Sequence, residues 1–334
     1  MKYTEEKDKS KVYKQSYVNG FEYIIAERQK QAEKIRSEYI KGVFENPEKY
    51  REDLKRMLGW PLAGYTSTEV PEVKTTLLST EDGYEVYRMQ FEILPGLEMT
   101  GLFFKAGEKA PLVIVQHGGL GTPELISGMY GSTHNYNDML ERVRDKGVHV
   151  FAPQLLLWAE DYDVPFDRKE VDARLKRVGS SITAIEVFGI TRIIDYFETQ
   201  PYVKNFGMVG MSYGGFYTLY TSAVDTRIKA AVSCSFFNKR DVTGWPDWVW
   251  QNSAEKFDDA EVACLVYPRK IWIQMGNNDP LFDYKYTEES FKRVEELCPC
   301  GLKNWAELKI FEGNHEFYKG DEYIEKLAEE LKKE

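Results

Sequence analysis

A serine between glycines is the feature of this 334-residue chain that first suggests chemistry. Ser212 lies in Gly210-Met211-Ser212-Tyr213-Gly214, after the apolar run Phe206–Val209 and before residues 215–220, which can begin a helix. A serine hydroxyl is a poor nucleophile at neutral pH, so it needs a nearby base and an exposed position at a sharp strand-to-helix turn. The context predicts a nucleophilic serine, although Gly-x-Ser-x-Gly alone also occurs in ordinary loops.

Two later segments supply the acid and the base that such a serine requires, in that order. Asp279 follows the apolar strand pattern Ile271–Met275, and His315 follows the short strand pattern Leu308–Phe311. Loops that follow parallel strands converge on one edge of a sheet. We therefore expect Asp279 and His315 to meet Ser212 at that edge as a catalytic triad.

Each partner also has a plainer interpretation. Asp279 precedes Pro280, and Asp-Pro often opens a turn. Asp283 is a rival acid, disfavoured because it lies farther from the end of the strand. His315 could be a loop histidine without a catalytic role. The remaining histidines, which all precede the serine and so have the wrong order, are His117, His134 and His149.

A glycine-rich loop, Gln116–Gly121, follows the apolar strand pattern Leu112–Val115. Attack by a serine on a carbonyl creates an oxyanion, and each preorganised N–H donor that stabilises it lowers the barrier by roughly 3 kcal/mol. The N–H groups of Gly119 and Tyr213 are the predicted donors. The preceding loop residues His117 and Gly118 are predicted to contact substrate.

Two aromatic segments are predicted to select the substrate. The first follows the strand pattern Val148–Ala152 and contains Trp158 and Glu160, and the second contains Trp245 and Trp248. Aromatic rings can stack on a sugar or an aromatic acid, and they also commonly pack as a core beneath a loop. We predict substrate contacts for these four side chains, with core packing as the alternative.

Composition favours a soluble cytoplasmic enzyme. Hydrophobic residues make up 43% of the chain and charged residues 29%, which allows a large core beneath a polar surface. The net charge of −10 argues against a nucleic-acid partner, which needs a basic surface. The first residues lack the apolar core of a signal peptide, and no run is long enough to span a membrane.

The cysteines are too few and too irregularly spaced for a disulfide framework or a zinc site. They are Cys234, Cys264, Cys298 and Cys300. Nothing else in the sequence requires a metal, so we expect neither a metal ion nor a cofactor.

The pattern divides the chain into an N-terminal helical extension, residues 1–62, and a catalytic domain, residues 63–334. A second helix of the extension is expected over Pro47–Leu58. One apolar stripe recurs at helical spacing and comprises Val18, Phe21, Ile25, Ala32, Ile35 and Tyr39. We expect this stripe to pack on the catalytic domain; a contact between subunits of a homo-oligomer is the alternative.

In the catalytic domain, strands over Val73–Leu78 and Tyr84–Phe91 flank an Asp-Gly turn and predict a hairpin. Strands and helices then alternate from Leu112 onward. This alternation predicts an α/β fold with a mainly parallel sheet, helices on both faces and the hairpin as an antiparallel edge. Helices are expected over Tyr136–Arg144, Thr183–Phe197, from Tyr213, over Thr287–Leu297 and over Glu322–Leu331.

From about Arg51 to its C-terminus the chain resembles the α/β-hydrolase superfamily, and within it the dienelactone-hydrolase-like and acetyl xylan esterase-like group. The motifs that carry the resemblance are Leu58–Leu62, His117–Gly119, Gly210–Gly215, Asp225–Val232, Tyr267–Lys270, Gly276–Pro280 and the His315 loop. The resemblance implies an α/β-hydrolase fold in which Ser212, Asp279 and His315 are nucleophile, acid and base, with the oxyanion donors named above. Dienelactone hydrolases proper carry cysteine where this chain has Ser212, which favours an esterase.

These observations predict a serine ester hydrolase that acts through an acyl-enzyme on short-chain, acetyl-like esters of small molecules or sugars. The expected partner is therefore a small-molecule ester, with neither nucleic acid nor membrane. An acyl or prolyl-type peptidase would use the same triad, but such enzymes usually carry a propeller domain that this sequence does not contain. A non-catalytic hydrolase-fold binding protein is the third interpretation, and such proteins typically lose a member of the triad.

Overall fold

The computed structural model describes residues 2–81, 83–158, 164, 166–242, 244–298, 301 and 305–333. Within these residues, nine strands form one sheet in the order β1-β2-β3-β5-β4-β6-β7-β8-β9. The strands are β1 (Val73–Glu81), β2 (Tyr84–Leu94), β3 (Leu97–Ala106), β4 (Ala110–Gln116), β5 (His149–Pro153), β6 (Val203–Met211), β7 (Ile228–Cys234), β8 (Lys270–Gly276) and β9 (Ala306–Phe311).

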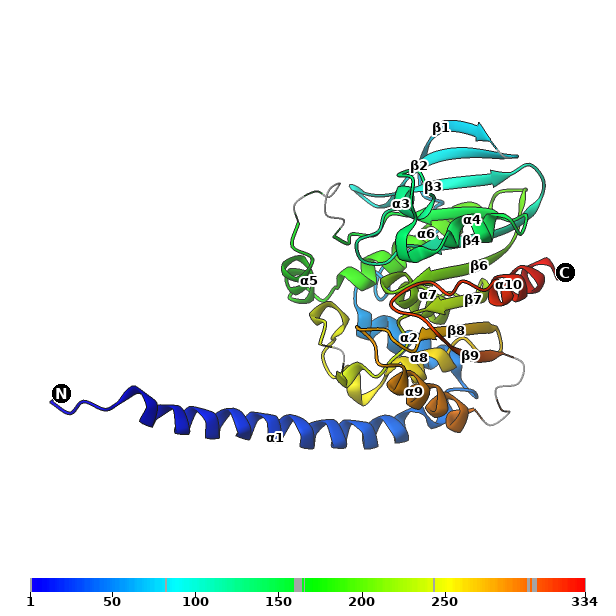
Figure 1. Ribbon diagram of the computed structural model, residues 1–334. Helices are drawn as coiled ribbons and strands as arrows, with labels where there is room; N and C mark the ends of the chain where they lie inside the picture. Colours follow the sequence, from blue (N-terminus) through cyan, green and yellow to red (C-terminus); the bar gives the residue numbers. More distant parts are fainter. Residues whose placement is uncertain are drawn as a thin grey trace.

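Strand pairing confirms the predicted architecture. β1, β2 and β3 pair antiparallel, and β3 pairs antiparallel with β5. Every pair from β5 across to β9 is parallel, so the carboxyl ends of these strands share one edge. The sheet is therefore mainly parallel, with the hairpin at its antiparallel edge (Figure 1).

Helices cover both faces of the sheet (Figure 1). They are α1 (Lys7–Tyr39), α2 (Pro47–Leu58), α3 (Pro123–Ile126), α4 (Met139–Arg144), α5 (Arg168–Lys176), α6 (Ile182–Glu198), α7 (Tyr213–Val224), α8 (Asp259–Cys264), α9 (Tyr284–Leu297) and α10 (Glu322–Lys332). Buried side chains of α2, α6, α7, α8 and α9 form a core on one face, and those of α3, α4 and α10 form a core on the other. Strand β4 shows why both faces are covered: Leu112 and Ile114 enter the first core, while Val113 and Val115 enter the second.

The starts of two helices differ from the prediction by three residues. The helix expected from Tyr136 begins only at Met139, because Asn137 and Asp138 adopt positive φ angles of 48° and 55° that interrupt it. A short 3-10 helix, η2 (His134–Tyr136), takes its place. Helix α9 begins earlier than expected, at Tyr284, where the residue before it supplies an N-cap.

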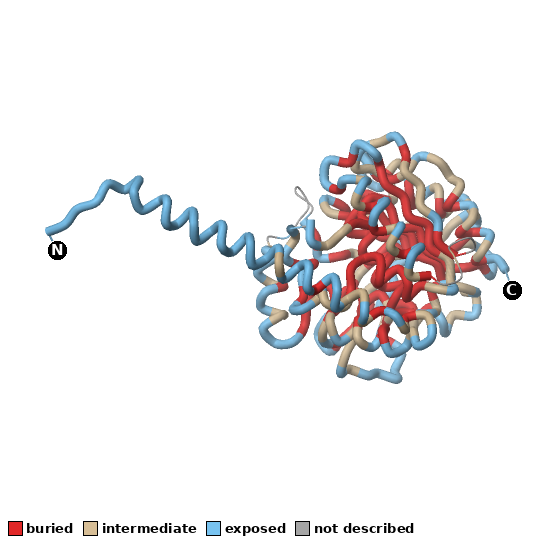
Figure 2. The backbone as a smooth tube through the Cα atoms, turned by 90° about the horizontal axis from the view of Figure 1, so that it is seen from below, coloured by how far each residue is buried: buried red, intermediate tan, exposed pale blue. Residues whose placement is uncertain are grey.

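Helix α1 corrects the expectation that the whole apolar stripe packs on the catalytic domain. Its first half projects away from the rest of the molecule (Figures 1 and 2), and Ala32 is the only buried stripe residue within the helix. Contact begins near the C-terminal end, where Arg28 binds Glu255 at 3.0 Å and Arg36 donates to the Ala254 carbonyl at 2.7 Å.

No helix in the described part of the chain is both long enough and apolar enough to cross a bilayer. Helix α2 has the predicted bounds.

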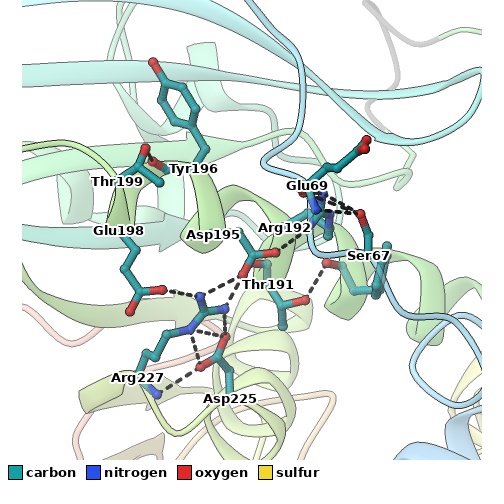
Figure 3. Close-up of polar contacts among 11 residues, drawn as sticks. Ser67, Glu69, Thr191, Arg192, Asp195, Tyr196, Glu198, Thr199, Asp225 and Arg227 are labelled. Atoms are coloured by element: carbon teal, nitrogen blue, oxygen red, sulfur yellow. Dashed lines mark hydrogen bonds and ion pairs between the residues drawn. The ribbon is translucent and has the colours of Figure 1, made fainter.

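A polar network at the amino ends of the parallel strands holds α6 in place (Figure 3). Arg227, which precedes β7, contacts Asp195 of α6 at 2.7 Å and Asp225 at 2.6 Å. Burial opposes the charge of Arg227, but these carboxylates outweigh it and raise the pKa of the guanidinium. Arg192 of α6 binds Asp195 at 2.5 Å and also donates to the backbone carbonyl of Glu69, so the segment before β1 joins the same network.

Candidate active site

Ser212 occupies the sharp turn between β6 and α7. Its φ of 58° and ψ of −123° are a strained combination for a residue with a side chain. Two backbone hydrogen bonds hold the turn: the Ser212 N–H donates to the Cys234 carbonyl at 2.9 Å, and the Ser212 carbonyl accepts from the Phe216 N–H at 2.9 Å. The backbone therefore presents the hydroxyl at the carboxyl edge of the sheet.

The glycines around Ser212 are required because backbone segments approach closely. A Cβ on Gly210 would lie 2.2 Å from the Gly214 carbonyl oxygen, and one on Gly214 would lie 2.1 Å from the Gln116 carbonyl oxygen. Neither glycine has a positive φ. The Gly-x-Ser-x-Gly pattern thus brings β6 and α7 together and sets both against the end of β4.

Asp279 and His315 come together in the structure. Asp279 Oδ2 lies 2.7 Å from His315 Nδ1, and its other oxygen accepts from the Leu281 and Phe282 N–H groups at 2.8 and 3.1 Å. The Asp279 side chain is fully buried. A carboxylate at Nδ1 favours the tautomer in which Nδ1 carries the proton, so Nε2 is left to act as a base.

Asp283, the rival acid, has a different contact. Its carboxylate accepts from the Lys285 N–H at 3.0 Å and caps the N-terminus of α9. The sequence could not separate two aspartates four residues apart by type, but the structure gives only Asp279 the contact with His315.

The loops that carry the acid and the base are tied to each other. The Asn278 N–H donates to the Gly313 carbonyl at 2.9 Å, and a Cβ on Gly276 would lie 2.3 Å from the Asn314 carbonyl oxygen. Asn135 of the η2 segment donates from its side chain to the His315 carbonyl at 3.0 Å. The backbone of the His315 loop is therefore held from both the β8 loop and the segment that follows β4.

A cavity of about 620 Å³ opens beside Ser212 and His315. Its apolar lining comes from Leu120, Leu125, Met211, Leu281, Trp158 and Trp245, and its remaining lining from Gly119, His134, Asn135, Tyr136 and Tyr213. A mostly apolar cavity whose lining includes a few polar groups is typical of a small-molecule site.

Gly119 and Tyr213, the predicted oxyanion donors, both line this cavity. Tyr213 is the first residue of α7, and the first N–H groups of a helix have no acceptor within it. The neighbouring donor is already used, because the Gly118 N–H donates to the Tyr136 hydroxyl at 2.9 Å. Gly119 also lies tight against the cavity wall, since a Cβ there would come 3.0 Å from the Trp158 ring.

His117 and Gly118 lie behind the cavity wall, so the predicted contact with substrate is replaced by a structural role. His117 is fully buried, its Nε2 accepts from the Leu155 N–H at 3.0 Å, and its Nδ1 lies 2.9 Å from the Gly118 carbonyl oxygen. Burial lowers the pKa of His117 to about 4. The neutral ring therefore braces the glycine-rich loop against the loop after β5.

The predicted tryptophans separate into two groups. Trp158 and Trp245 line the cavity, and the Trp245 ring stacks on that of Tyr213 with centroids 5.2 Å apart. Trp248 is 2% exposed and packs among Phe216 and Phe236, so it supports the site from the core, where the alternative interpretation put it. Glu160 lies outside the described residues.

A buried ionic cluster behind Tyr213 was not predicted. Arg168 of α5 contacts Asp247 at 2.8 Å and Glu186 of α6 at 3.1 Å, with each of these side chains at most 4% exposed. The Tyr213 hydroxyl donates to Asp247 at 2.9 Å, and the Tyr217 hydroxyl donates to Glu186. Burial disfavours the Arg168 charge, but the neighbouring carboxylates outweigh it and raise the pKa. The cluster anchors the side chain of the residue whose N–H is a predicted oxyanion donor.

One sequence signal could have pointed to this cluster. Glu186 is the only charged residue among the first ten residues of α6, whose other polar members are two threonines. A lone carboxylate on a buried helix needs a cationic partner. The identity of this partner could not be read from spacing, because Arg168 lies 18 residues before Glu186 on another helix. The second carboxylate of the cluster, Asp247, lies 79 residues beyond Arg168.

The described residues contain no group of three or more His, Cys, Asp or Glu side chains that could hold a metal ion. The reactive groups that line the cavity are the Ser212 hydroxyl and the His315 imidazole. A serine at a strained turn, beside an oriented imidazole and an apolar cavity, can support nucleophilic acyl transfer.

Comparisons with known proteins identify the family of this chain and its fold. The model of the dienelactone hydrolase family matches residues 105–326. A search of curated protein sequences returned no match. Among solved structures, a glucuronoyl esterase from Solibacter usitatus superposes with a TM-score of 0.65 at 12% identity, covering 86% of this chain and 92% of that one.

Two further structures are similar. Acetyl xylan esterase 1 from Thermoanaerobacterium sp. has a TM-score of 0.55 at 15% identity, covering 85% of this chain and 94% of that one. A promiscuous esterase from a marine bacterial metagenome has a TM-score of 0.61 at 17% identity, covering 87% and 92%. At these identities the likeness establishes a shared fold, and it confirms the predicted α/β-hydrolase architecture.

Proposed function

This chain belongs to the dienelactone hydrolase family, and on that premise we propose that it is a serine carboxylic-ester hydrolase. The observation that carries the proposal is the 2.7 Å contact between Asp279 and His315, on loops that open into the same cavity as Ser212. Ser212 is the nucleophile, His315 the general base and Asp279 the acid that orients the imidazole.

The reaction proceeds through an acyl-enzyme. His315 Nε2 takes the proton of Ser212 as Oγ attacks the ester carbonyl, and Asp279 stabilises the imidazolium that forms. The carbonyl oxygen becomes an oxyanion that accepts hydrogen bonds from the Gly119 and Tyr213 N–H groups. The intermediate collapses as His315 protonates the departing alcohol, and water then repeats both steps to release the acid.

The substrate we propose is a short-chain, acetyl-like ester of a small molecule or a sugar. The cavity of about 620 Å³ has an apolar wall formed by Leu120, Leu125 and Met211, which suits a short acyl chain. The exposed ring of Trp158 and the partly buried ring of Trp245 line the cavity and offer a surface on which a sugar or another flat alcohol can stack. Esterases of similar fold whose names include acetyl xylan esterase and glucuronoyl esterase support an ester of a carbohydrate.

Hydrolysis of p-nitrophenyl esters from acetyl to octanoyl tests the proposal. Activity should be highest with acetate and should be lost in Ser212→Ala and in His315→Ala. A fluorophosphonate probe should label the wild-type chain and not Ser212→Ala, which identifies the nucleophile independently of the substrate. A wild-type chain that neither hydrolyses these esters nor reacts with the probe would overturn the assignment.

If the probe labels Ser212 but no ester is cleaved, the nucleophile is active and the acyl donor is of another class. Peptide substrates would then be the next assay, because a peptidase of this fold would use the same triad. A chain that is unreactive although correctly folded would favour a binding protein.

A further inference from the structure

The free half of α1, residues 7–26 and here called the arm, is exposed along its whole length (Figure 2). One of its faces is apolar. The residues of this arm stripe are Tyr13, Tyr17, Val18, Phe21, Ile24 and Ile25, all of them exposed. Tyr13 and Tyr17 have 76% and 72% of their surface exposed. Monomeric proteins rarely expose a contiguous apolar surface of this size, and a larger one usually marks an interaction site.

The arm stripe continues the face of α1 that already packs on the body of the molecule. Steps of three and four residues lead from Phe21 through Ile25 to Arg28, Ala32 and Arg36, and residues at this spacing share one helix face. Ala32 is buried, and both arginines bind the 3-10 helix η6 (Ser253–Glu255). A partner that covers the stripe therefore lies beside the body, on the side of η6.

We propose that this partner is a second copy of the chain and that two arms pair antiparallel about a twofold axis. With the axis between Tyr17 and Phe21, Tyr17 of one copy meets Phe21 of the other, and Tyr13 meets Ile25. An isologous interface of this kind requires a surface that is complementary to itself, which a stripe of similar apolar residues supplies.

The area of the stripe is sufficient for a stable dimer. At about 100 Å² for each of six half-exposed to mostly exposed side chains, two arms bury ~1,200 Å² in total, the lower end of the range for specific interfaces. Three of the six residues are aromatic, the class that interfaces favour.

A membrane surface fits the arm less well than a second copy does. Helices that lie in a bilayer surface usually carry lysine or arginine along their polar face. Between Lys14 and Arg28 the helix has no cation and carries Glu22 and Glu27 instead. The neutral and acidic polar face over the apolar part of the arm favours contact with protein.

Sedimentation velocity of the full chain, whose mass is 38.8 kDa, tests the proposal. The wild-type chain should sediment as a dimer at micromolar concentration. Tyr17→Asp combined with Phe21→Asp should raise the dissociation constant by about 100-fold or more, as expected when two central interface side chains are lost. The matched control is Gln15→Asp with Asn19→Asp, which adds the same charges at the same spacing on the opposite face and should remain dimeric.

Ester hydrolysis per chain should be unchanged in both double variants, which also shows that they fold. A wild-type chain that is monomeric at high micromolar concentration overturns the proposal, as does a dimer that survives the Tyr17 and Phe21 changes. Flotation with phosphatidylglycerol-containing vesicles tests for a membrane partner. If the chain is monomeric and binds these vesicles through Tyr17 and Phe21, the proposal is overturned and the arm binds a membrane surface.

Discussion

The edge of the sheet that carries Ser212 and the free arm of α1 are built in opposite ways. At the edge, charged and polar groups such as Asp279, Arg168 and Asp247 are buried, and each has partners within the chain. In the arm, large apolar groups such as Tyr17 and Phe21 are 72% and 51% exposed, and the arm projects away from the body (Figure 2). The chain alone therefore determines the geometry of the edge, whereas the state of the arm depends on another molecule. Substitutions should have large effects at the edge and small ones in the arm.

The largest effect is expected for Asp279→Asn. An amide at this position stabilises the wrong tautomer of His315. We expect kcat to fall by about 10⁴-fold, as it does in a serine protease with the equivalent change. This loss corresponds to an activation barrier that is higher by about 5.5 kcal/mol. The measurement is kcat for p-nitrophenyl acetate. Asp283→Asn is the matched control and should keep its activity, because asparagine also caps helices well. Equal losses in the two variants would mean that the acid has been assigned incorrectly.

The buried cluster behind Tyr213 should show the next largest effect. Asp247→Ala leaves Arg168 with one carboxylate fewer and the Tyr213 hydroxyl without its acceptor, so the free energy of unfolding should fall by about 3–5 kcal/mol. Urea unfolding followed by tryptophan fluorescence measures this change. Asp8→Ala removes an exposed ion pair of the arm and should change the free energy by less than about 0.5 kcal/mol. Similar values for the two variants would contradict the contrast between the regions.

The fully buried His117 should make the edge sensitive to acid. Its pKa is lowered to about 4 in the folded protein, whereas the unfolded chain has the ordinary value of about 6.5. Between these values the unfolded state binds a proton that the folded state does not. The free energy of unfolding should therefore fall as the pH drops through this window, by up to about 3 kcal/mol, and this contribution should be constant above it.

The measurement is urea unfolding at a series of pH values for the wild-type chain and for His117→Gln. Glutamine does not titrate, so every other group contributes equally to the pH dependence of both chains. The difference between the two curves therefore isolates the titration of His117. A difference that is the same at pH 4 and at pH 7 would show that burial does not hold this imidazole neutral.

Much of the edge could be predicted because its residues follow strands directly. Ser212, Asp279 and His315 each stand one loop after an apolar strand, and parallel strands bring such loops together. The cluster around Arg168 could not be predicted, since its members lie on α5, α6 and a distant loop with no common spacing. His117 and Trp248 were assigned to the cavity by their place in the sequence, but burial puts both behind its wall.

The arm shows a different limit of sequence analysis. Periodicity correctly indicates a helix with one apolar face, since that pattern is local. It does not indicate what covers the face, because a contact with the chain's own body and one with a second copy require the same residues. The break at Asn137 and Asp138 was missed for a related reason, as an apolar spacing continues through two residues whose backbone leaves the helix.

The smallest effect is expected in the arm and can be measured against a matched residue. Ile24→Ala removes a side chain that is 58% exposed, whereas Ile40→Ala, just beyond the end of the same helix, removes one that is fully buried. In dilute protein the buried change should lower the free energy of unfolding by about 2–5 kcal/mol and the exposed change by less than about 0.5 kcal/mol.

Protein concentration distinguishes the two changes further, because binding to the folded state adds a concentration-dependent term to stability. If two arms pair, Ile24→Ala should become destabilising relative to the wild-type chain as concentration rises, while the effect of Ile40→Ala should grow much less. If Ile24→Ala is as costly as Ile40→Ala in dilute solution, the arm packs on its own body. The contrast between the arm and the edge of the sheet would then disappear.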